Sequence, residues 1–74
     1  MNINQNINRL LYVLQKKGKI YKINSFQFYS EKKDKYITKY QVQKRNIYEK
    51  YDIEEECYSK VDVLKYFMKE YGKM

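Results

Sequence analysis

The stretch from Lys19 to Arg45 constrains the fold of this chain most, because two runs of alternating residues flank a short charged segment there. Successive side chains of a strand point to opposite faces of a sheet, so such runs indicate two strands with one buried and one outward face. The charged segment from Ser30 to Asp34 supplies a turn. The sequence therefore predicts a β-hairpin.

The first strand of this hairpin must be irregular if all of its apolar residues are to be buried. Its apolar side chains fall into two opposite phases: Tyr21 and Ile23 in one, Phe26 and Phe28 in the other. A β-bulge near residues 24–25 would bring both sets to one face. Phe28 then lies opposite Tyr36. Phe26 lies opposite Thr38 in the same way.

Two amphipathic helices are predicted to flank the strands. Apolar residues recur with the helical period from Ile3 to Lys17, Asn2 and Gln5 are placed to form a capping box, and Gly18 ends the helix. A second helical pattern follows the capping residue Ser59. Its expected inner face consists of Val61, Leu64, Phe67, Met68 and Tyr71.

A third alternating run, from Tyr51 to Cys57, adds a third strand. We expect Tyr51, Ile53 and Cys57 on its buried face and Asp52, Glu54 and Glu56 on its outer face. The order of elements predicts an α+β fold, a two-layer αβββα domain with a three-stranded antiparallel sheet and two amphipathic helices on one face. We expect residues 1–74 to form a single domain. The expected core consists of Ile7, Leu11, Leu14, Phe26, Phe28, Tyr40, Ile53, Leu64 and Phe67.

The composition excludes several function classes. The chain has no histidine, proline or tryptophan and a single cysteine, Cys57, so zinc clusters, disulfide frameworks and histidine-based catalysis have no residues to use. We therefore expect neither an enzyme nor a cofactor. No apolar run is long enough to span a membrane, and the amino terminus lacks the apolar centre of a signal peptide. We expect a cytoplasmic protein with no membrane partner.

The positive charge is unevenly distributed along the chain. The formal net charge is +7; residues 1–45 carry 11 Lys and Arg against two acidic residues, and residues 46–74 carry five against seven. Coding in an AT-rich genome enriches lysine, asparagine, isoleucine and tyrosine, and so accounts for part of the total. It does not account for the concentration of charge in the first part of the chain, which points to an anionic partner.

The outer face and turn of the hairpin are the predicted binding surface. Cations there suit phosphates, and amide or ring side chains suit bases or sugars, so we expect nucleic acid as the partner, with duplex DNA favoured over RNA. Pairs such as Lys39 with Glu54 on the acidic third strand would neutralise part of the surface. The candidate nucleic-acid-binding residues are Lys22, Gln27, Tyr29, Lys32, Lys33, Lys35, Lys39, Gln41 and Arg45.

The alternative is a protein partner. Ten tyrosines are more than so small a core can hide, and exposed tyrosine commonly anchors protein interfaces. This favours a small adaptor or inhibitor of the kind that phages and mobile elements encode. A thin core also favours a homodimer, formed through a helix face or the edge of the first strand.

The order of elements is similar to that of two families of nucleic-acid-binding modules. Double-stranded RNA-binding domains share the αβββα order, and the segment from Ser59 to Lys65 loosely resembles the lysine-bearing start of their second helix. The arm-binding domains of transposon and phage integrases have a similar three-stranded sheet backed by a carboxy-terminal helix, over Lys19 to Tyr71. Both resemblances imply binding of a nucleic-acid backbone or groove.

Overall fold

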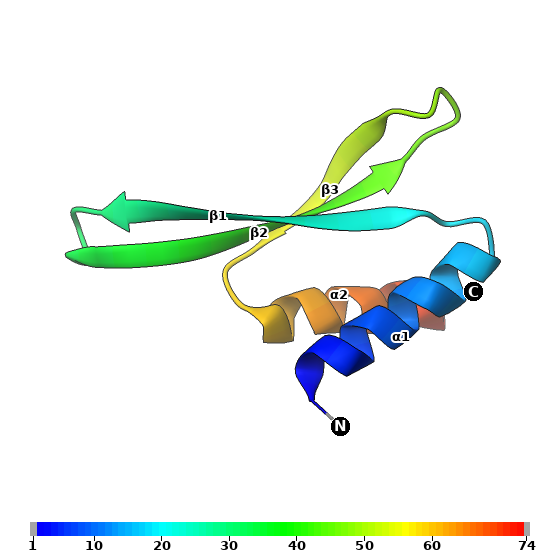
Figure 1. Ribbon diagram of the computed structural model, residues 1–74, viewed down its shortest axis with the longest axis horizontal. Coiled ribbons are helices and arrows are strands. Elements are labelled where there is room, and N and C mark those ends of the chain that lie inside the picture. Colours follow the sequence, from blue (N-terminus) through cyan, green and yellow to red (C-terminus); the bar gives the residue numbers. More distant parts are fainter. Residues whose placement is uncertain (1, 74) are drawn as a thin grey trace.

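The computed structural model describes residues 2–73 and contains two helices and one antiparallel sheet (Figure 1). Its elements are α1 (Ile3–Lys16), β1 (Tyr21–Ser30), β2 (Lys35–Arg45), β3 (Tyr51–Cys57) and α2 (Lys60–Gly72). The strands lie in the order β1-β2-β3, and both helices pack side by side on one face of the sheet. The predicted α+β fold is confirmed. Within residues 2–73, no helix is long and apolar enough to cross a membrane.

Helix α1 begins and ends where the sequence predicts. The Asn2 side chain accepts a hydrogen bond of 2.9 Å from the Gln5 amide, and the Gln5 side chain accepts one of 3.2 Å from the Asn2 amide, which completes the capping box. At the other end Gly18 adopts a left-handed φ of 84°. The Lys19 amide then donates to the Leu14 carbonyl over 2.9 Å, so the helix ends in a Schellman motif.

The core lies between the helices and the half of the sheet that they cover. Phe67 is fully buried and meets the ring of Tyr21 edge to face at 5.4 Å. Leu11, Tyr40 and Leu64 pack against the core but are only partly buried. The buried hydrophobic residues are Ile7, Leu14, Val42, Cys57, Val63 and Phe67.

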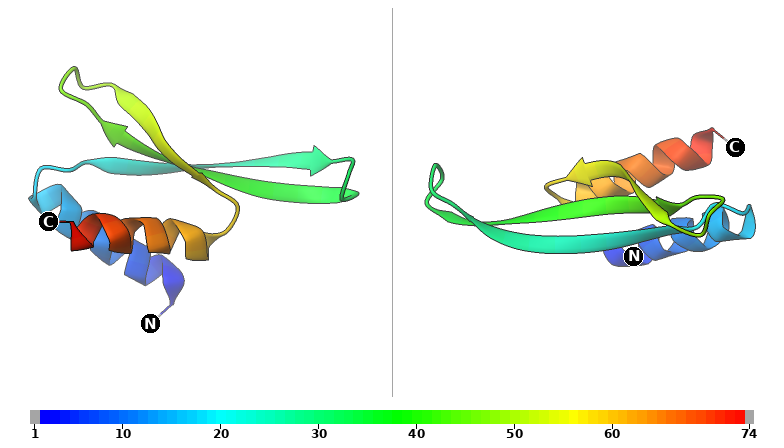
Figure 2. Two further views of the ribbon diagram at one scale, coloured as in Figure 1. Left: turned by 180° about the vertical axis from the view of Figure 1, so that it is seen from behind. Right: turned by 90° about the horizontal axis from the view of Figure 1, so that it is seen from above.

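The predicted bulge in β1 is wrong. β1 and β2 pair in a regular register in which Phe28 lies opposite Ile37 and Phe26 opposite Lys39. Both phenylalanines therefore lie on the face turned away from the helices, where Phe26 is 46% and Phe28 41% exposed. The helices do not extend beneath this end of the hairpin (Figures 1 and 2). A bulge would have broken the hydrogen-bond ladder without burying either ring.

A bulge occurs in β3 instead. Val42 pairs with Glu55 and Gln43 with Ile53, which leaves Glu54 as the additional residue. The extra residue reverses the phase of the strand, so Ile53 faces away from the helices and is 57% exposed while Cys57 is buried. The expectation that Ile53 and Cys57 share a buried face is therefore wrong, and Ile53 is not part of the core.

Helix α2 presents a different side to the sheet than the sequence predicts. The Ser59 hydroxyl accepts from the Asp62 amide over 3.2 Å, so the predicted cap is present. Val63 and Phe67 are buried, whereas Val61 and Met68 are exposed. The helix carries two apolar stripes about a third of a turn apart, and the stripe with the large Phe67 ring takes the core position.

The hairpin extends past the helices as a two-stranded ribbon, which we call the hairpin arm (residues 25–39). It lies at the left of Figure 1, and the view from above in Figure 2 shows it clear of both helices. Its turn is held by local hydrogen bonds: the Ser30 hydroxyl accepts from the Lys33 amide over 3.3 Å, and the Tyr29 hydroxyl donates to Asp34, which has a left-handed φ of 52°. The arm thus carries its turn lysines on a defined loop.

Candidate nucleic-acid interface

The face of the sheet opposite the helices is the candidate interface, and we call it the outer face. The register of the three strands places its side chains, because alternate residues of each strand share a face. It consists of Lys22, Asn24, Phe26 and Phe28 on β1, Lys35, Ile37, Lys39, Gln41, Gln43 and Arg45 on β2, and Tyr51, Ile53 and Glu56 on β3.

Seven of the nine predicted binding residues lie on the outer face or at the turn of the hairpin arm. Those on the outer face are Lys22, Lys35, Lys39, Gln41 and Arg45, and those at the turn are Lys32 and Lys33. Gln27 and Tyr29 lie on the opposite face, and their predicted place beside the lysines is wrong. Without the expected bulge the strand keeps its phase, and the Tyr29 ring packs against Tyr36 at 5.4 Å.

Glu56 is the one acidic residue on the outer face of the described strands. Its carboxylate lies 2.6 Å from the Lys39 ammonium and accepts a 3.1 Å hydrogen bond from Gln41. The bond from Lys39, followed by that from Gln41, lowers the pKa of Glu56, and the same contact raises the pKa of Lys39. The predicted partner of Lys39 was Glu54. The β3 bulge turns Glu54 away from Lys39, and Glu54 borders a hollow near the β2–β3 turn instead.

Lysine and aromatic side chains meet at both ends of the outer face. The Lys22 ammonium lies 4.2 Å from the centre of the Tyr51 ring. Near the turn, a hollow of about 450 Å³ is bordered by two lysines and by aromatic and aliphatic groups, and none of its lining residues is acidic. Its lining residues are Phe28, Lys33, Lys35, Tyr36, Ile37 and Tyr58.

Sequence reasoning missed the aromatic part of this surface. Phe26 and Phe28 were assigned to the core because large apolar residues are usually buried. The signal that could have placed them correctly is their phase, which opposes that of Tyr21 and Ile23 along an uninterrupted strand. Tyr58 follows β3 and was not assigned to any surface.

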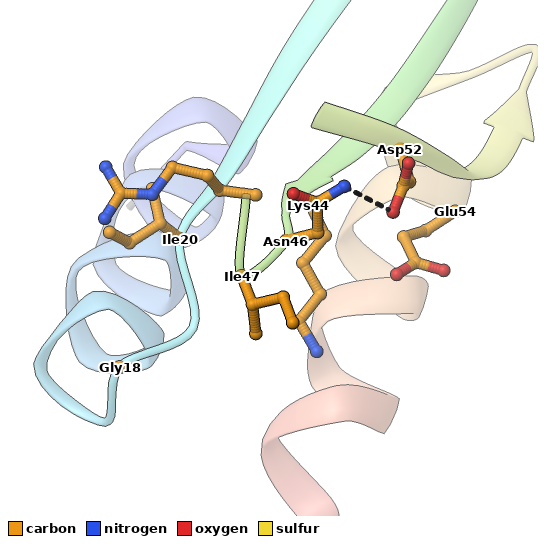
Figure 3. Close-up of a pocket in the computed structure, with 8 residues that line it drawn as sticks. Gly18, Ile20, Lys44, Asn46, Ile47, Asp52 and Glu54 are labelled. Carbon is orange, nitrogen blue, oxygen red and sulfur yellow. Dashed lines mark hydrogen bonds between the residues drawn. The ribbon is translucent and has the colours of Figure 1, made fainter. Parts of the chain in front are cut away.

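A second hollow, of about 510 Å³, lies at the opposite end of the sheet, beside the β2–β3 turn (Figure 3). Asn46 organises this turn: its side-chain oxygen accepts from the Tyr48 and Lys50 amides at 2.9 and 3.1 Å, and its amide group donates to Asp52 over 3.2 Å. Two cations, Lys44 and Arg45, line the hollow together with two carboxylates, Asp52 and Glu54. The mixture of charges favours no anionic ligand there.

Among residues 2–73, no three or more cysteine, aspartate or glutamate side chains are placed so that they could hold a metal ion together. Cys57 is buried, and burial raises the pKa of its thiol, so the sulfur stays protonated and unreactive near neutral pH. The side chains gathered on the outer face can bind and orient a ligand through charge, stacking and hydrogen bonds.

No protein-family model matches this chain, and no curated protein and no solved structure matches it significantly.

Proposed function

We propose that this protein binds nucleic acid through the outer face of its sheet and the turn lysines of the hairpin arm. The observation that carries the proposal is the charge of that face: Lys22, Lys35, Lys39 and Arg45 stand there against Glu56 alone. The helices occupy the other side of the sheet, so the outer face is open to a large ligand. The role is binding without catalysis, in the cytoplasm.

Phosphates and bases are contacted by different parts of the surface in this proposal. Lys32 and Lys33 are exposed at the turn and neither forms an ion pair within the described chain, so they are available to phosphates. Gln41 and Gln43 lie between the cations, linked by a 3.3 Å hydrogen bond, and offer amide groups to base edges. A two-stranded ribbon such as the hairpin arm is also narrow enough to enter the major groove of duplex DNA.

The salt dependence of binding tests the proposal. If about four phosphates are neutralised, the logarithm of the association constant falls with the logarithm of salt concentration with a slope near −3.6 on duplex DNA. Replacing both Lys32 and Lys33 by alanine removes two contacts and makes the slope shallower by about 1.8. Replacing Lys65 and Lys69, which are exposed on α2, is the matched control and leaves the slope unchanged.

Two results would contradict the proposal. One is a chain that binds neither duplex nor single strands at low salt. The other is a turn variant, Lys32→Ala with Lys33→Ala, that loses no more affinity than the α2 control.

Binding of a protein partner is a second candidate, and the exposed stripe of α2 favours it. Val61, Leu64, Met68 and Tyr71 recur with helical spacing, and Met68 is 57% exposed. Leu64 and Met68 form a shallow groove with Leu10 of α1. An apolar groove between helices suits an apolar segment of another protein, as in a phage-type adaptor or inhibitor. Exposed tyrosines such as Tyr12 and Tyr48 add possible anchors, whereas Tyr66 is half-buried against Phe67.

This second function predicts that Met68→Glu abolishes capture of the partner and leaves nucleic-acid binding intact. Isothermal titration with the captured protein, once purified, measures the effect. Equal affinity for the parent and the Met68→Glu variant would remove the groove as the docking site.

A further inference from the structure

The hollow beside the turn of the hairpin arm combines the two chemistries that recognise a nucleotide. Lys33 and Lys35 supply cations for a phosphate, while Phe28 and Tyr58 supply aromatic rings for a base. The hollow of about 450 Å³ lies within the size range of small-molecule sites. The hollow between β3 and α2 differs, because its five carboxylates outnumber its three lysines, Lys65, Lys69 and Lys73, and the excess of negative charge does not favour an anion.

The spacing of the exposed rings favours a single strand over a duplex. Phe26 and Phe28 point to the same face two residues apart, which places them about 6.6 Å apart along the strand. Successive bases in a duplex strand lie about 3.4 Å apart. One base can therefore stack on each ring only if the nucleic acid is extended and its bases are separated, as in a single strand.

The charge of the outer face decides between a nucleic acid and a second copy of this chain as its occupant. Exposed apolar side chains alone would also suit a symmetric pairing of two outer faces. Such a pairing would bring the outer-face cations Lys22, Lys35 and Arg45 of one copy against those of the other, with Glu56 already paired to Lys39. A polyanion with flat bases complements both the cations and the rings.

We propose that the outer face is a binding site for a single strand of DNA or RNA. Bases stack on Phe26 and Phe28, and a further base or sugar lies against Tyr58 in the hollow. Lys33 and Lys35 hold the adjoining phosphates. This inference rests on the proposed nucleic-acid function and specifies the class of strand and the atoms that contact it.

A tryptophan introduced at the site reports stacking directly, because the chain has none of its own. In the variant Phe28→Trp the indole lies on the outer face, and we expect an oligothymidine of about 12 nucleotides, within the usual footprint of such sites, to quench its emission on binding. Tyr48→Trp, in the β2–β3 turn, is the matched control and should not be quenched. Emission from Phe28→Trp that is unchanged while anisotropy shows the strand bound would overturn the inference.

Alanine variants measure how much each ring contributes. Phe28→Ala or Phe26→Ala should weaken binding of the labelled oligothymidine by roughly 5- to 150-fold, the range expected for loss of one stacked base. Phe28→Trp should bind at least as tightly as the parent protein. A circular-dichroism melt of Phe28→Ala within a few degrees of the parent shows that its loss of binding is not a failure to fold. Tyr12→Ala, an exposed tyrosine on α1, should bind like the parent protein.

The comparison of strands separates this inference from the proposed function. We expect oligothymidine and oligouridine to bind more tightly than a duplex of the same length at the same salt concentration. If the duplex binds as tightly or more so, and the phenylalanine variants bind normally while Lys32→Ala with Lys33→Ala does not, the stacking site is wrong and the nucleic-acid function stands. If no nucleic acid binds, both are wrong.

Discussion

Two phenylalanines in opposite environments provide a test of the strand register. Phe67 is fully buried, with Tyr21 and Tyr66 against it at ring separations of 5.4 and 5.6 Å. Phe67→Ala deletes this ring from the centre of the core and should lower the free energy of unfolding by about 3–5 kcal/mol. Phe28 is 41% exposed on the outer face, so Phe28→Ala removes only a cross-strand contact with Ile37 and should cost less than about 1 kcal/mol.

Urea and thermal unfolding, followed by circular dichroism, measure both changes. A chain of this size has a total stability of roughly 4–11 kcal/mol, so Phe67→Ala should be largely unfolded or should melt at least about 12 °C below the parent. Phe28→Ala should melt within a few degrees of the parent. Equal and large destabilisation by the two substitutions would refute this reasoning, because it would place Phe28 in the core and not on the outer face.

Further predictions concern charge, backbone and association. Glu56→Gln frees Lys39 and should tighten nucleic-acid binding at pH 7, with a salt slope steeper by about 0.7 to 0.9. The ion pair lowers the pKa of Glu56, so the tighter binding of the variant relative to the parent should persist down to acidic pH. The difference in affinity should vanish only once the parent carboxylate is protonated. Gly18→Ala should cost about 1 kcal/mol in urea unfolding, since φ is 84° and nothing lies within 4 Å of an added Cβ, so that only backbone strain acts. β1 is an edge strand with one charged residue, Lys22, and no bulge, whereas the bulged and acidic β3 is protected against pairing with another chain. We therefore expect a dimer formed through β1, which light scattering from micromolar to millimolar concentration should detect. A monomer throughout this range would contradict the prediction.

The sequence predicted the structure correctly wherever the conformation depends only on a few neighbouring residues. The ends of α1 follow from Asn2, Gln5 and Gly18, whose capping chemistry needs only a few neighbouring residues. The strand limits follow from alternation and from the charged turn. The general position of the binding lysines follows in the same way, because Lys22, Lys35 and Lys39 share a phase across two paired strands.

The errors arose where the outcome depends on how far one element extends over another. The helices do not extend beneath the hairpin arm, so a bulge there would bury neither ring; β1 keeps its regular register and Phe26 and Phe28 lie exposed on the outer face. No local pattern shows how far the helices reach. The run of three glutamates likewise does not indicate the bulge at Glu54, yet this bulge reverses which residues of β3 are buried. Because of these two features, the outer face is aromatic and basic and carries a single carboxylate, Glu56. The sequence had predicted a basic surface with an acidic border.

The most direct test of the account is a map of the bound strand on the protein surface. Titration of nitrogen-15-labelled protein with unlabelled oligothymidine, followed by amide chemical shifts, reports which residues sense the ligand. We predict that the largest shifts come from the outer face and the turn, centred on Phe26, Phe28 and Lys33, with α2 unaffected. Shifts centred on the α2 groove around Leu64 and Met68, or no shifts at concentrations that saturate other basic proteins, would contradict the claim that the outer face binds nucleic acid.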